Sequence, residues 1–332
     1  MKKLNGWSGM AALAAVTAAT LAGCGTPKPQ DIRLLTNQQL KAFFGKVQDP
    51  RRYAITLYDS DDGALFVGTS RLHPDQQAVL PFASGSGNRA PVVSLSVGRG
   101  DSLPVLLDTS SRDSWLRFEK AVELEAIPLG TDRAFGMTPR HVREDVPGYA
   151  CRVSTLIFDT LRMENVLFYV RSASGPLGVL GRRAEHPVPE AVLGCNALKA
   201  FAFVQIDYSM RLAAFSSSFG YTPKPEQLVA ELPLNEIDGQ WAVDGMVDGQ
   251  PGPIILDTAG DFELSVTNAS VHLMKQLSLG DLVFRQVRAI TSRDNGLEPQ
   301  KYPRLGRQLL SRYKVTFDNL HSMVYFERPD NP

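Results

Sequence analysis

The chain carries two copies of one sequence pattern, and this duplication restricts the possible fold more than the composition does. The segment Gly194–Phe201 parallels Gly306–Tyr313, with Leu at the fifth position and an aromatic residue at the eighth. Each segment leads into a strand-like stretch that ends in an acid, Val204–Asp207 in the first copy and Val315–Asp318 in the second. Both copies then place a Phe eight residues beyond that acid. An ordered set of matches of this kind indicates two structurally related units.

Each copy also contains an apolar run that ends in Asp-Thr followed by a small residue. These runs are Val105–Ser110 and Ile254–Ala259, and their acids are Asp108 and Asp257. From residue 92 onward, short apolar or alternating stretches are separated by turns rich in Gly, Asp and Pro. This pattern is typical of an all-β protein.

Together these motifs resemble the pepsin and retropepsin-like aspartic peptidase family. That family has Asp-Thr-small followed later by hydrophobic-hydrophobic-Gly, which is Val192–Gly194 in the first copy, whereas Arg304–Gly306 lacks one hydrophobic position. The first copy, Asp108–Trp115, is similar to the amino-terminal lobe of pepsins, and the second is more similar to a retroviral protease subunit. In that subunit the acid at the fifth place of the motif pairs with the Arg after the Gly. The resemblance therefore implies an ion pair between Asp261 and Arg307.

The likeness covers about residues 92 to 328 and implies a fold and a domain order. The implied fold class is all-β, a bilobal acid-protease (pepsin/retropepsin-like) fold of two pseudo-symmetric β-barrel-like lobes, preceded by a small N-terminal segment. The expected parts are a signal peptide, then a tether with a short helix and accessory strands, a first lobe with a flap, and a second lobe without a long flap. Their predicted bounds are 1–23, 24–90, 91–222 and 223–332.

By the same resemblance the chain is predicted to be an aspartic endopeptidase with Asp108 and Asp257 as its catalytic residues. Two carboxylates in contact cannot both ionise easily, so they share a proton. One acid can then take a proton from water while the other donates to the substrate carbonyl. Because the pKa values belong to the pair, neither acid receives a fixed role. This chemistry requires no cofactor and no metal.

The resemblance also implies supporting roles for residues beside the two acids. Thr109 and Thr258 are expected to turn inward and bond to the backbone of the opposite lobe. Ser110 and Ala259 are expected to be small so that their amide groups approach the carboxylates. These residues would hold both turns rigidly.

Hydrogen-bond donors are expected to differ between the two turns. We predict that the Ser111 hydroxyl donates to Asp108, whereas Gly260 offers no hydroxyl to Asp257. Fewer donors to the ionised form leave a carboxyl pKa higher. A pH optimum less acidic than that of a gastric enzyme follows, which suits a periplasm near neutrality.

The two copies differ in length between the acid and the later Gly, with 86 residues in the first and 49 in the second. The longer spacing leaves room for a flap hairpin in the first lobe alone. Tyr149, followed by the alternating stretch Cys151–Phe158, is the flap candidate, with its ring covering substrate. An ordinary surface hairpin is the alternative interpretation.

The chain begins with a segment typical of an export signal. A basic start is followed by the short apolar run Met10–Ala22, which is too short to span a membrane comfortably.

The run ends at Cys24 in a sequence that resembles the lipobox of bacterial lipoproteins. This implies cleavage before Cys24 and attachment of acyl chains such as palmitate, which anchor firmly. Gly25, in place of Asp, implies the periplasmic face of the outer membrane in a bacterial cell envelope. A secreted protein cut nearby is the alternative.

The charge balance and the placement of His and Cys argue against nucleic-acid binding and against a metal site. The 35 basic residues balance 35 acidic residues, so we expect no nucleic-acid partner. The 5 His residues lie far apart and show no metal-ligand spacing. If Cys24 carries lipid, Cys151 and Cys195 remain, and either a disulfide or two buried thiols are compatible with the sequence.

The predicted partners are a peptide or unfolded protein substrate and, through Cys24, the membrane; we expect a monomer. The alternative function is a catalytically inactive retropepsin-like lipoprotein that binds extended peptides by strand addition. Three positions favour it, because Ser110 and Ala259 replace the commoner Gly and Gly260 removes a supporting hydroxyl. A fold does not guarantee activity. No role is assigned to residues 31–77.

Overall fold

The computed structural model describes most of the chain beyond its amino-terminal segment. The described residues are 36–60, 63–68, 70–83, 90–98, 100–131, 134–135, 137–138, 148–171, 189–267, 273–291 and 301–330. The predicted signal peptide and Cys24 lie outside these residues. None of the described helices has the length and apolar character needed to cross a membrane.

Six strands of the first lobe close into a barrel. They run in the order β12-β5-β6-β14-β7-β13, and pairing between β12 and β13 completes the ring. Alternation explains β5, where Val93, Leu95 and Val97 are buried while Ser94 is exposed. The strands are β5 (Val92–Val97), β6 (Asp101–Leu107), β7 (Trp115–Arg117), β12 (Gly148–Phe158), β13 (Leu161–Arg171) and β14 (Ala191–Leu193).

The second lobe repeats this ring. Its order is β19-β20-β24-β21-β23-β22, closed by pairing between β19 and β22, and β18 (Asn235–Ile237) adds to its edge. The ring strands are β19 (Gln240–Val247), β20 (Gln250–Leu256), β21 (Leu264–Val266), β22 (Leu273–Leu279), β23 (Leu282–Thr291) and β24 (Arg304–Leu305).

Corresponding elements of the two lobes pair in the same way. Strand β14 runs parallel to β6 and antiparallel to β7, as β24 runs parallel to β20 and antiparallel to β21. A short helix follows in each lobe, α4 (Cys195–Leu198) and α5 (Arg307–Leu310). The predicted fold class, all-β with two pseudo-symmetric β-barrel-like lobes, is confirmed.

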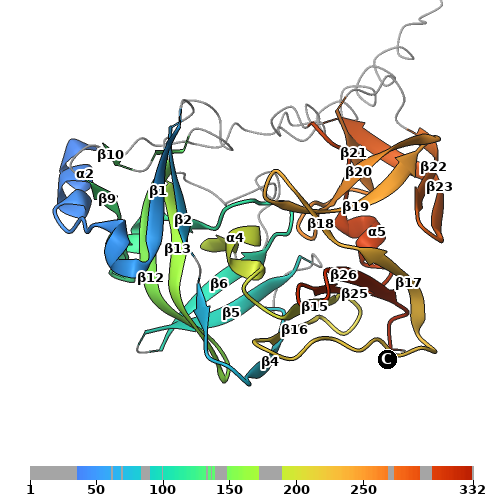
Figure 1. The fold of residues 1–332 in the computed structure, drawn as a ribbon, viewed down its shortest axis with the longest axis horizontal. Coiled ribbons are helices and arrows are strands. Elements are labelled where there is room, and N and C mark those ends of the chain that lie inside the picture. The colour runs from blue at the N-terminus through green and yellow to red at the C-terminus, as the bar shows by residue number, and fades with distance from the viewer. Residues whose placement is uncertain are drawn as a thin grey trace, which may run out of the picture. The chain divides into compact units, whose positions relative to one another are not determined.

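A six-stranded sheet joins the two lobes, in the order β17-β26-β25-β15-β16-β4. Its centre is the antiparallel pairing of β15 from one copy with β25 from the other, which lie between the lobes in Figure 1. Strand β4 lies before the predicted start of the first lobe at residue 91, yet it pairs with β16 as β17 pairs with β26. The strands are β4 (Gln77–Pro81), β15 (Phe203–Asp207), β16 (Leu212–Ser216), β17 (Leu228–Pro233), β25 (Lys314–Asp318) and β26 (Met323–Glu327).

The predicted short helix is present as α2 (Asn37–Phe44). Thr36 and Gln39 form a reciprocal capping box at its start. Phe43 is buried and packs edge-on against Phe118, so the helix contacts the first lobe. The other small elements of this region and the first lobe are η1 (Pro50–Tyr53), β1 (Ile55–Ser60), β2 (Gly63–Gly68), β3 (Arg71–Leu72), α3 (Phe118–Glu123), β8 (Ile127–Pro128), β9 (Gly130–Thr131), β10 (Ala134–Phe135) and β11 (Met137–Thr138).

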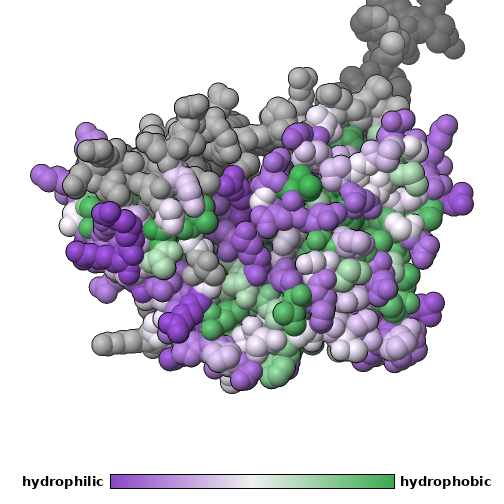
Figure 2. Space-filling model, viewed as in Figure 1, coloured by the Kyte–Doolittle hydropathy of each residue, from purple (hydrophilic) through white to green (hydrophobic). Residues whose placement is uncertain are grey.

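One large apolar core runs through both barrels and the shared sheet, including Val105, Leu256 and Phe317. Cys151 and Cys195 are separate buried thiols, which decides between the two alternatives left by the sequence. Burial raises the pKa of both thiols well above the ordinary range. On the face shown in Figure 2, hydrophobic residues of the described chain lie in small patches between hydrophilic ones.

Candidate active site

Each lobe presents one aspartate on the turn that follows a central strand. Asp108 follows β6, and its backbone amide donates to Leu193 on β14 at 3.1 Å. Asp257 follows β20, and its amide donates to Leu305 on β24 at 2.9 Å. Both acids are buried, with exposed fractions of 4% and 0%. The parallel strand pair in each lobe therefore fixes the position of its acid.

Two threonines tie these turns to each other across the lobes. The Thr258 hydroxyl donates to the Leu107 carbonyl at 2.8 Å, and the Thr109 hydroxyl donates to the Leu256 carbonyl at 2.5 Å. The Thr109 amide also donates to the Thr258 hydroxyl at 3.1 Å. All of these groups are buried, so the bonds are shielded from water. The cross-lobe bonding predicted for both threonines is present, and it brings the two turns together.

Around Asp108, a hydroxyl and two backbone amides donate to one carboxylate oxygen. Asp108 Oδ1 accepts from the Ser110 hydroxyl at 2.7 Å, from the Ser110 amide at 2.9 Å and from the Ser111 amide at 3.2 Å. The prediction that the Ser111 hydroxyl makes this bond is wrong. That hydroxyl donates to the Asp113 carbonyl at 2.7 Å, closing its own turn, so it faces away from Asp108.

Asp257 has backbone donors but no hydroxyl donor. Its Oδ1 accepts from the amides of Gly260 at 2.6 Å and Ala259 at 3.1 Å, as expected from the small residue at 259. Its Oδ2 is buried and accepts no hydrogen bond from the described residues. A Cβ at Gly260 would lie 2.8 Å from this oxygen and closer still to the Phe262 ring. The absence of a side chain at 260 is therefore a steric requirement of the turn.

A cation that sequence reasoning missed lies between the two turns. Arg304 on β24 has a side chain only 17% exposed, and its Nη1 is 3.9 Å from Asp257 Oδ2 and 3.3 Å from Ser110 Oγ. Since that hydroxyl donates to Asp108, it links the guanidinium to the second acid. The signal in the sequence was the missing hydrophobic position before Gly306, where the side chain of Arg304 now enters the site.

Burial and charge raise the proton affinity of the Asp108 carboxyl. Burial raises its pKa from 3.8 to about 6, and the nearby Asp257 carboxylate acts in the same direction. The Ser110 hydrogen bond and the Arg304 charge act in the opposite direction. The negative charge of Asp257 therefore acts on the Asp108 carboxyl.

The predicted ion pair on the second turn is also present. Arg307 Nη2 lies 3.2 Å from Asp261 Oδ1, and Arg307 is almost fully buried on α5. The Gln308 amide group donates to the same oxygen at 3.2 Å. This contact joins the second turn to the helix behind it, in line with a supporting rather than a catalytic position.

Other groups that the sequence did not indicate hold the turns in place. The Tyr208 hydroxyl donates to the Thr258 carbonyl at 3.0 Å, and the Cys195 thiol donates to the Thr109 carbonyl at 3.1 Å. The Gln240 side-chain amide donates to the Ser110 carbonyl. In each case a side chain donates a hydrogen bond to the backbone of a residue distant in sequence. No local sequence motif predicts such a contact.

Tyr149 has a different environment from the one predicted for a flap residue. It is the second residue of β12, and its ring packs edge-on against Phe44 of α2, with ring centroids 5.0 Å apart. One contact of the Tyr149 ring is therefore with the accessory helix. Residues 139–147 of the predicted flap region lie outside the described residues.

No cluster of three or more metal-ligating side chains occurs in the part of the chain that the structure describes. The candidate site consists of the pair of aspartate turns with Arg304, Ser110 and the cross-lobe threonines.

Comparisons with known proteins give little beyond the fold. No family model matches the chain, and no curated protein matches it. Among solved structures, it is similar to soybean basic 7S globulin, at 13% identity and a TM-score of 0.46, covering 76% of this chain and 95% of that one. It is also similar to conglutin gamma, a basic 7S globulin from lupine seeds, at 11% identity and a TM-score of 0.46, covering 77% and 95%.

These findings correct the family assignment made from the motifs. Membership of the pepsin and retropepsin-like family is not supported by any family model. The Asp-Thr-small motifs are only a few residues long, and motifs of that length occur in proteins that lack the rest of a family's sequence. They were therefore insufficient for a family assignment. What the chain does has to be argued from its own site.

Proposed function

We propose that this chain hydrolyses peptide bonds with a water molecule activated between Asp108 and Asp257. The observation that carries the proposal is the reciprocal threonine bonding, which holds two buried aspartate turns against each other across the lobes. A pair of coupled carboxyl groups can supply both the base and the acid that amide hydrolysis needs. The substrate is an extended peptide or an unfolded protein.

The position of Arg304 suggests how the two acids divide the work. The cation lies on the Asp257 side, so a negative charge is better compensated on Asp257, while Asp108 holds the shared proton. Asp257 takes a proton from water as the water oxygen bonds to the substrate carbonyl carbon, and Asp108 donates its proton to the carbonyl oxygen.

Collapse of the resulting gem-diol completes the reaction. The proton on Asp257 passes to the amide nitrogen as the carbon–nitrogen bond breaks, and one gem-diol hydroxyl returns its proton to Asp108. The products are a carboxylic acid and an amine, and the pair regains its starting protonation state. No covalent bond to the enzyme forms in this scheme.

A second candidate function is peptide binding without hydrolysis, and Arg304 favours it. Pairs of carboxyl groups share a proton because like charges repel, and a buried cation 3.9 Å from one of them weakens that repulsion. A charge-compensated pair would activate water poorly. The chain would then hold extended peptides through strand addition at its site.

Membrane attachment through lipid on Cys24 is part of the same proposal. The lipobox-like sequence supports it, and it would place the site at the periplasmic face of the outer membrane. Growth with labelled palmitate should label the wild-type protein, and Cys24→Ser should remove both the label and the membrane association. Label retained in Cys24→Ser would refute attachment at this residue.

Purified protein incubated with a denatured protein and an unbiased peptide library tests the proposed hydrolysis. Asp108→Asn and Asp257→Asn should each lower cleavage by at least ~10³-fold, since each removes one half of the proton-transfer pair. Asp281→Asn, on an exposed turn of the second lobe, is the matched control and should cleave like wild type. Wild-type protein that binds peptides without cutting them would favour the binding function instead.

A further inference from the structure

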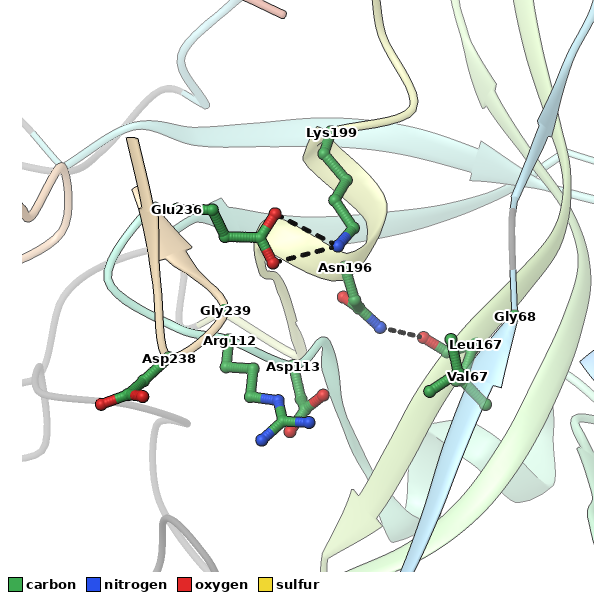
Figure 3. Close-up of a pocket in the computed structure, with 10 residues that line it drawn as sticks. All are labelled: Val67, Gly68, Arg112, Asp113, Leu167, Asn196, Lys199, Glu236, Asp238 and Gly239. Atoms are coloured by element: carbon green, nitrogen blue, oxygen red, sulfur yellow. Dashed lines mark hydrogen bonds and ion pairs between the residues drawn. The ribbon is translucent and has the colours of Figure 1, made fainter. Parts of the chain in front are cut away.

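A pocket lies beside the first aspartate turn, between the first lobe and the turn that joins β18 to β19 (Figure 3). Its volume is about 370 Å³, enough for an amino-acid side chain, and its lining includes the apolar Leu167 as well as charged groups. Ser111 connects it to the site. The amide of Ser111 donates to Asp108, and its hydroxyl donates to the Asp113 carbonyl in the pocket wall.

Asp113 is the unusual member of the pocket lining. The described residues contain five buried aspartates, and four of them accept hydrogen bonds at the carboxylate: Asp108, Asp207, Asp257 and Asp318. Asp113 is only 6% exposed, yet its carboxylate receives no hydrogen bond and no ion pair from the described residues. Burial raises the pKa of its carboxyl to about 6, while the positive charges of Arg112 and Lys199 act in the opposite direction. Its oxygens are not among the fully buried polar atoms without a partner, so they remain open to the pocket, where a cation would stabilise their charge.

The other charged groups at the pocket leave Asp113 available. Lys199 Nζ is 3.3 Å from Glu236, so that cation is already paired across the lobes. The stem of Arg112 lies against Gly239, where an added Cβ would come within 2.6 Å of it, and Arg112 makes no ion pair with a described residue. With Asp238 included, three carboxylates and two cations line the pocket. The lining residues therefore carry one net negative charge, although Asp238 also lies 3.9 Å from Lys301 Nζ.

In Figure 3 the Asp113 carboxylate lies beside the Arg112 guanidinium, and the Lys199–Glu236 pair lies on the opposite side of the pocket. Asn196 is held in the wall by donating to the Leu167 carbonyl at 3.2 Å. Asn196 is thus fixed by its own bond, whereas the Asp113 carboxylate and the Arg112 guanidinium make no hydrogen bond with a described residue.

We propose that this pocket binds the cationic side chain of a lysine or arginine in the peptide, with the Asp113 carboxylate as its ion-pair partner and Leu167 against its aliphatic stem. The proposal rests on the proposed function in one respect, that a peptide lies across the two aspartate turns. In this arrangement a residue near the scissile bond enters the pocket, whose wall Ser111 links to the first aspartate turn. The chain would accordingly select peptides with a basic residue at one position.

Binding, measured without cleavage, tests this inference. Fluorescent extended peptides carrying a single lysine at successive positions, each with a norleucine counterpart, are titrated into the Asp257→Asn protein and followed by anisotropy. At one position, lysine should bind about 10-fold more tightly than norleucine, as a charge-assisted contact provides. Asp113→Asn in the same background should reduce this ratio below about 3-fold, whereas Asp281→Asn should leave it unchanged.

The outcomes separate this inference from the proposed function. Lysine selectivity that depends on Asp113 supports the pocket even if the wild-type protein cuts nothing. Cleavage without a basic preference, or a preference that survives Asp113→Asn, overturns the pocket and leaves hydrolysis intact. If Asp113→Asn does not fold, as judged by thermal melting, Asp113→Ser takes its place, with the same expected loss of selectivity.

Discussion

The two aspartate turns have the same backbone and different charge environments. In the first lobe, Asp108 accepts from a hydroxyl and two amides, and Ser110, two residues further along the chain, provides that hydroxyl. In the second lobe, Asp257 accepts from amides alone and has Arg304 beside its other oxygen. Duplication therefore fixes where the acids lie, and single side chains decide how they share charge.

The lobes also differ in the elements that surround their six-stranded rings. The first lobe has 11-residue strands at β12 and β13 and carries a helix and small strands from the amino-terminal region, whereas β22 and β23 of the second lobe have 7 and 10 residues. Both rings nevertheless close through the same strand pairs. Extensions at the hairpins are thus tolerated because they do not alter the pairings that position the acids.

The largest effect is expected from breaking the link between the two turns. Thr258→Val keeps the shape but leaves the buried Leu107 carbonyl and Thr109 amide without their partner. Denaturant unfolding should show a loss of about 2–4 kcal/mol. Thr160→Val, whose hydroxyl bond to Gln77 is exposed, is the matched control and should change stability by less than about 0.5 kcal/mol. Equal effects from both variants would contradict the structural role of the cross-lobe bonds.

Asp108→Asn should stabilise the fold at neutral pH. Between pH 3.8 and about 6 the folded chain binds more protons at Asp108 than the unfolded chain does, so stability falls as pH rises through this window. Removing the carboxyl removes that loss, which is on the order of 1–3 kcal/mol. Thermal melts at acid and neutral pH should therefore show a gain for Asp108→Asn that is present only at neutral pH. A melting temperature of Asp108→Asn below that of the wild type at neutral pH would contradict the claim that the ionised Asp108 carboxyl destabilises the fold.

Arg304→Leu tests whether the cation beside Asp257 controls the pKa of Asp108. The Arg304 charge lowers the pKa of Asp108, so its removal should move the alkaline limb of the pH–rate profile upward by about 1 pH unit. Arg304→Lys keeps the charge and should leave the limb near its wild-type position. An alkaline limb that stays fixed in Arg304→Leu would show that this cation does not govern the pair.

Ser110→Ala and Ser111→Ala form the finest comparison. The Ser110 hydrogen bond lowers the pKa of Asp108, and Ser110→Ala should raise the alkaline limb by about half a pH unit. The Ser111 hydroxyl bonds to Asp113 instead, so Ser111→Ala should leave the limb unchanged. The reverse pattern in the two profiles would reinstate the donor assignment predicted from the sequence.

Features set by backbone register were predictable from the sequence. Matching segments such as Val204–Asp207 and Val315–Asp318 gave the two-lobed fold, and they now pair at the centre of the shared sheet. The threonine bonds and the contact of Asp261 with Arg307 follow from the same register. Each of these depends on where the chain runs rather than on which rotamer a side chain adopts.

Features set by side-chain direction were not predictable. Ser110 and Ser111 are adjacent, and the choice of which hydroxyl meets Asp108 depends on the geometry of the turn. Arg304 occupies a position where the pattern expects an apolar residue, and its long side chain reaches into the site. Asp113 has a turn-forming residue type, so its lack of a donor becomes visible only when its burial is known.

Carbon-13 NMR of aspartate side-chain carboxyl groups, followed against pH, tests the pairing of the two acids directly. In the wild-type protein the Asp108 resonance, identified by its loss in Asp108→Asn, should titrate near pH 6. In Asp257→Asn this midpoint should move toward lower pH, because the neighbouring negative charge that favours the protonated form is gone. An Asp108 midpoint that is identical in the wild-type and Asp257→Asn proteins would contradict the account, since two acids that do not sense each other cannot hold one water molecule between them.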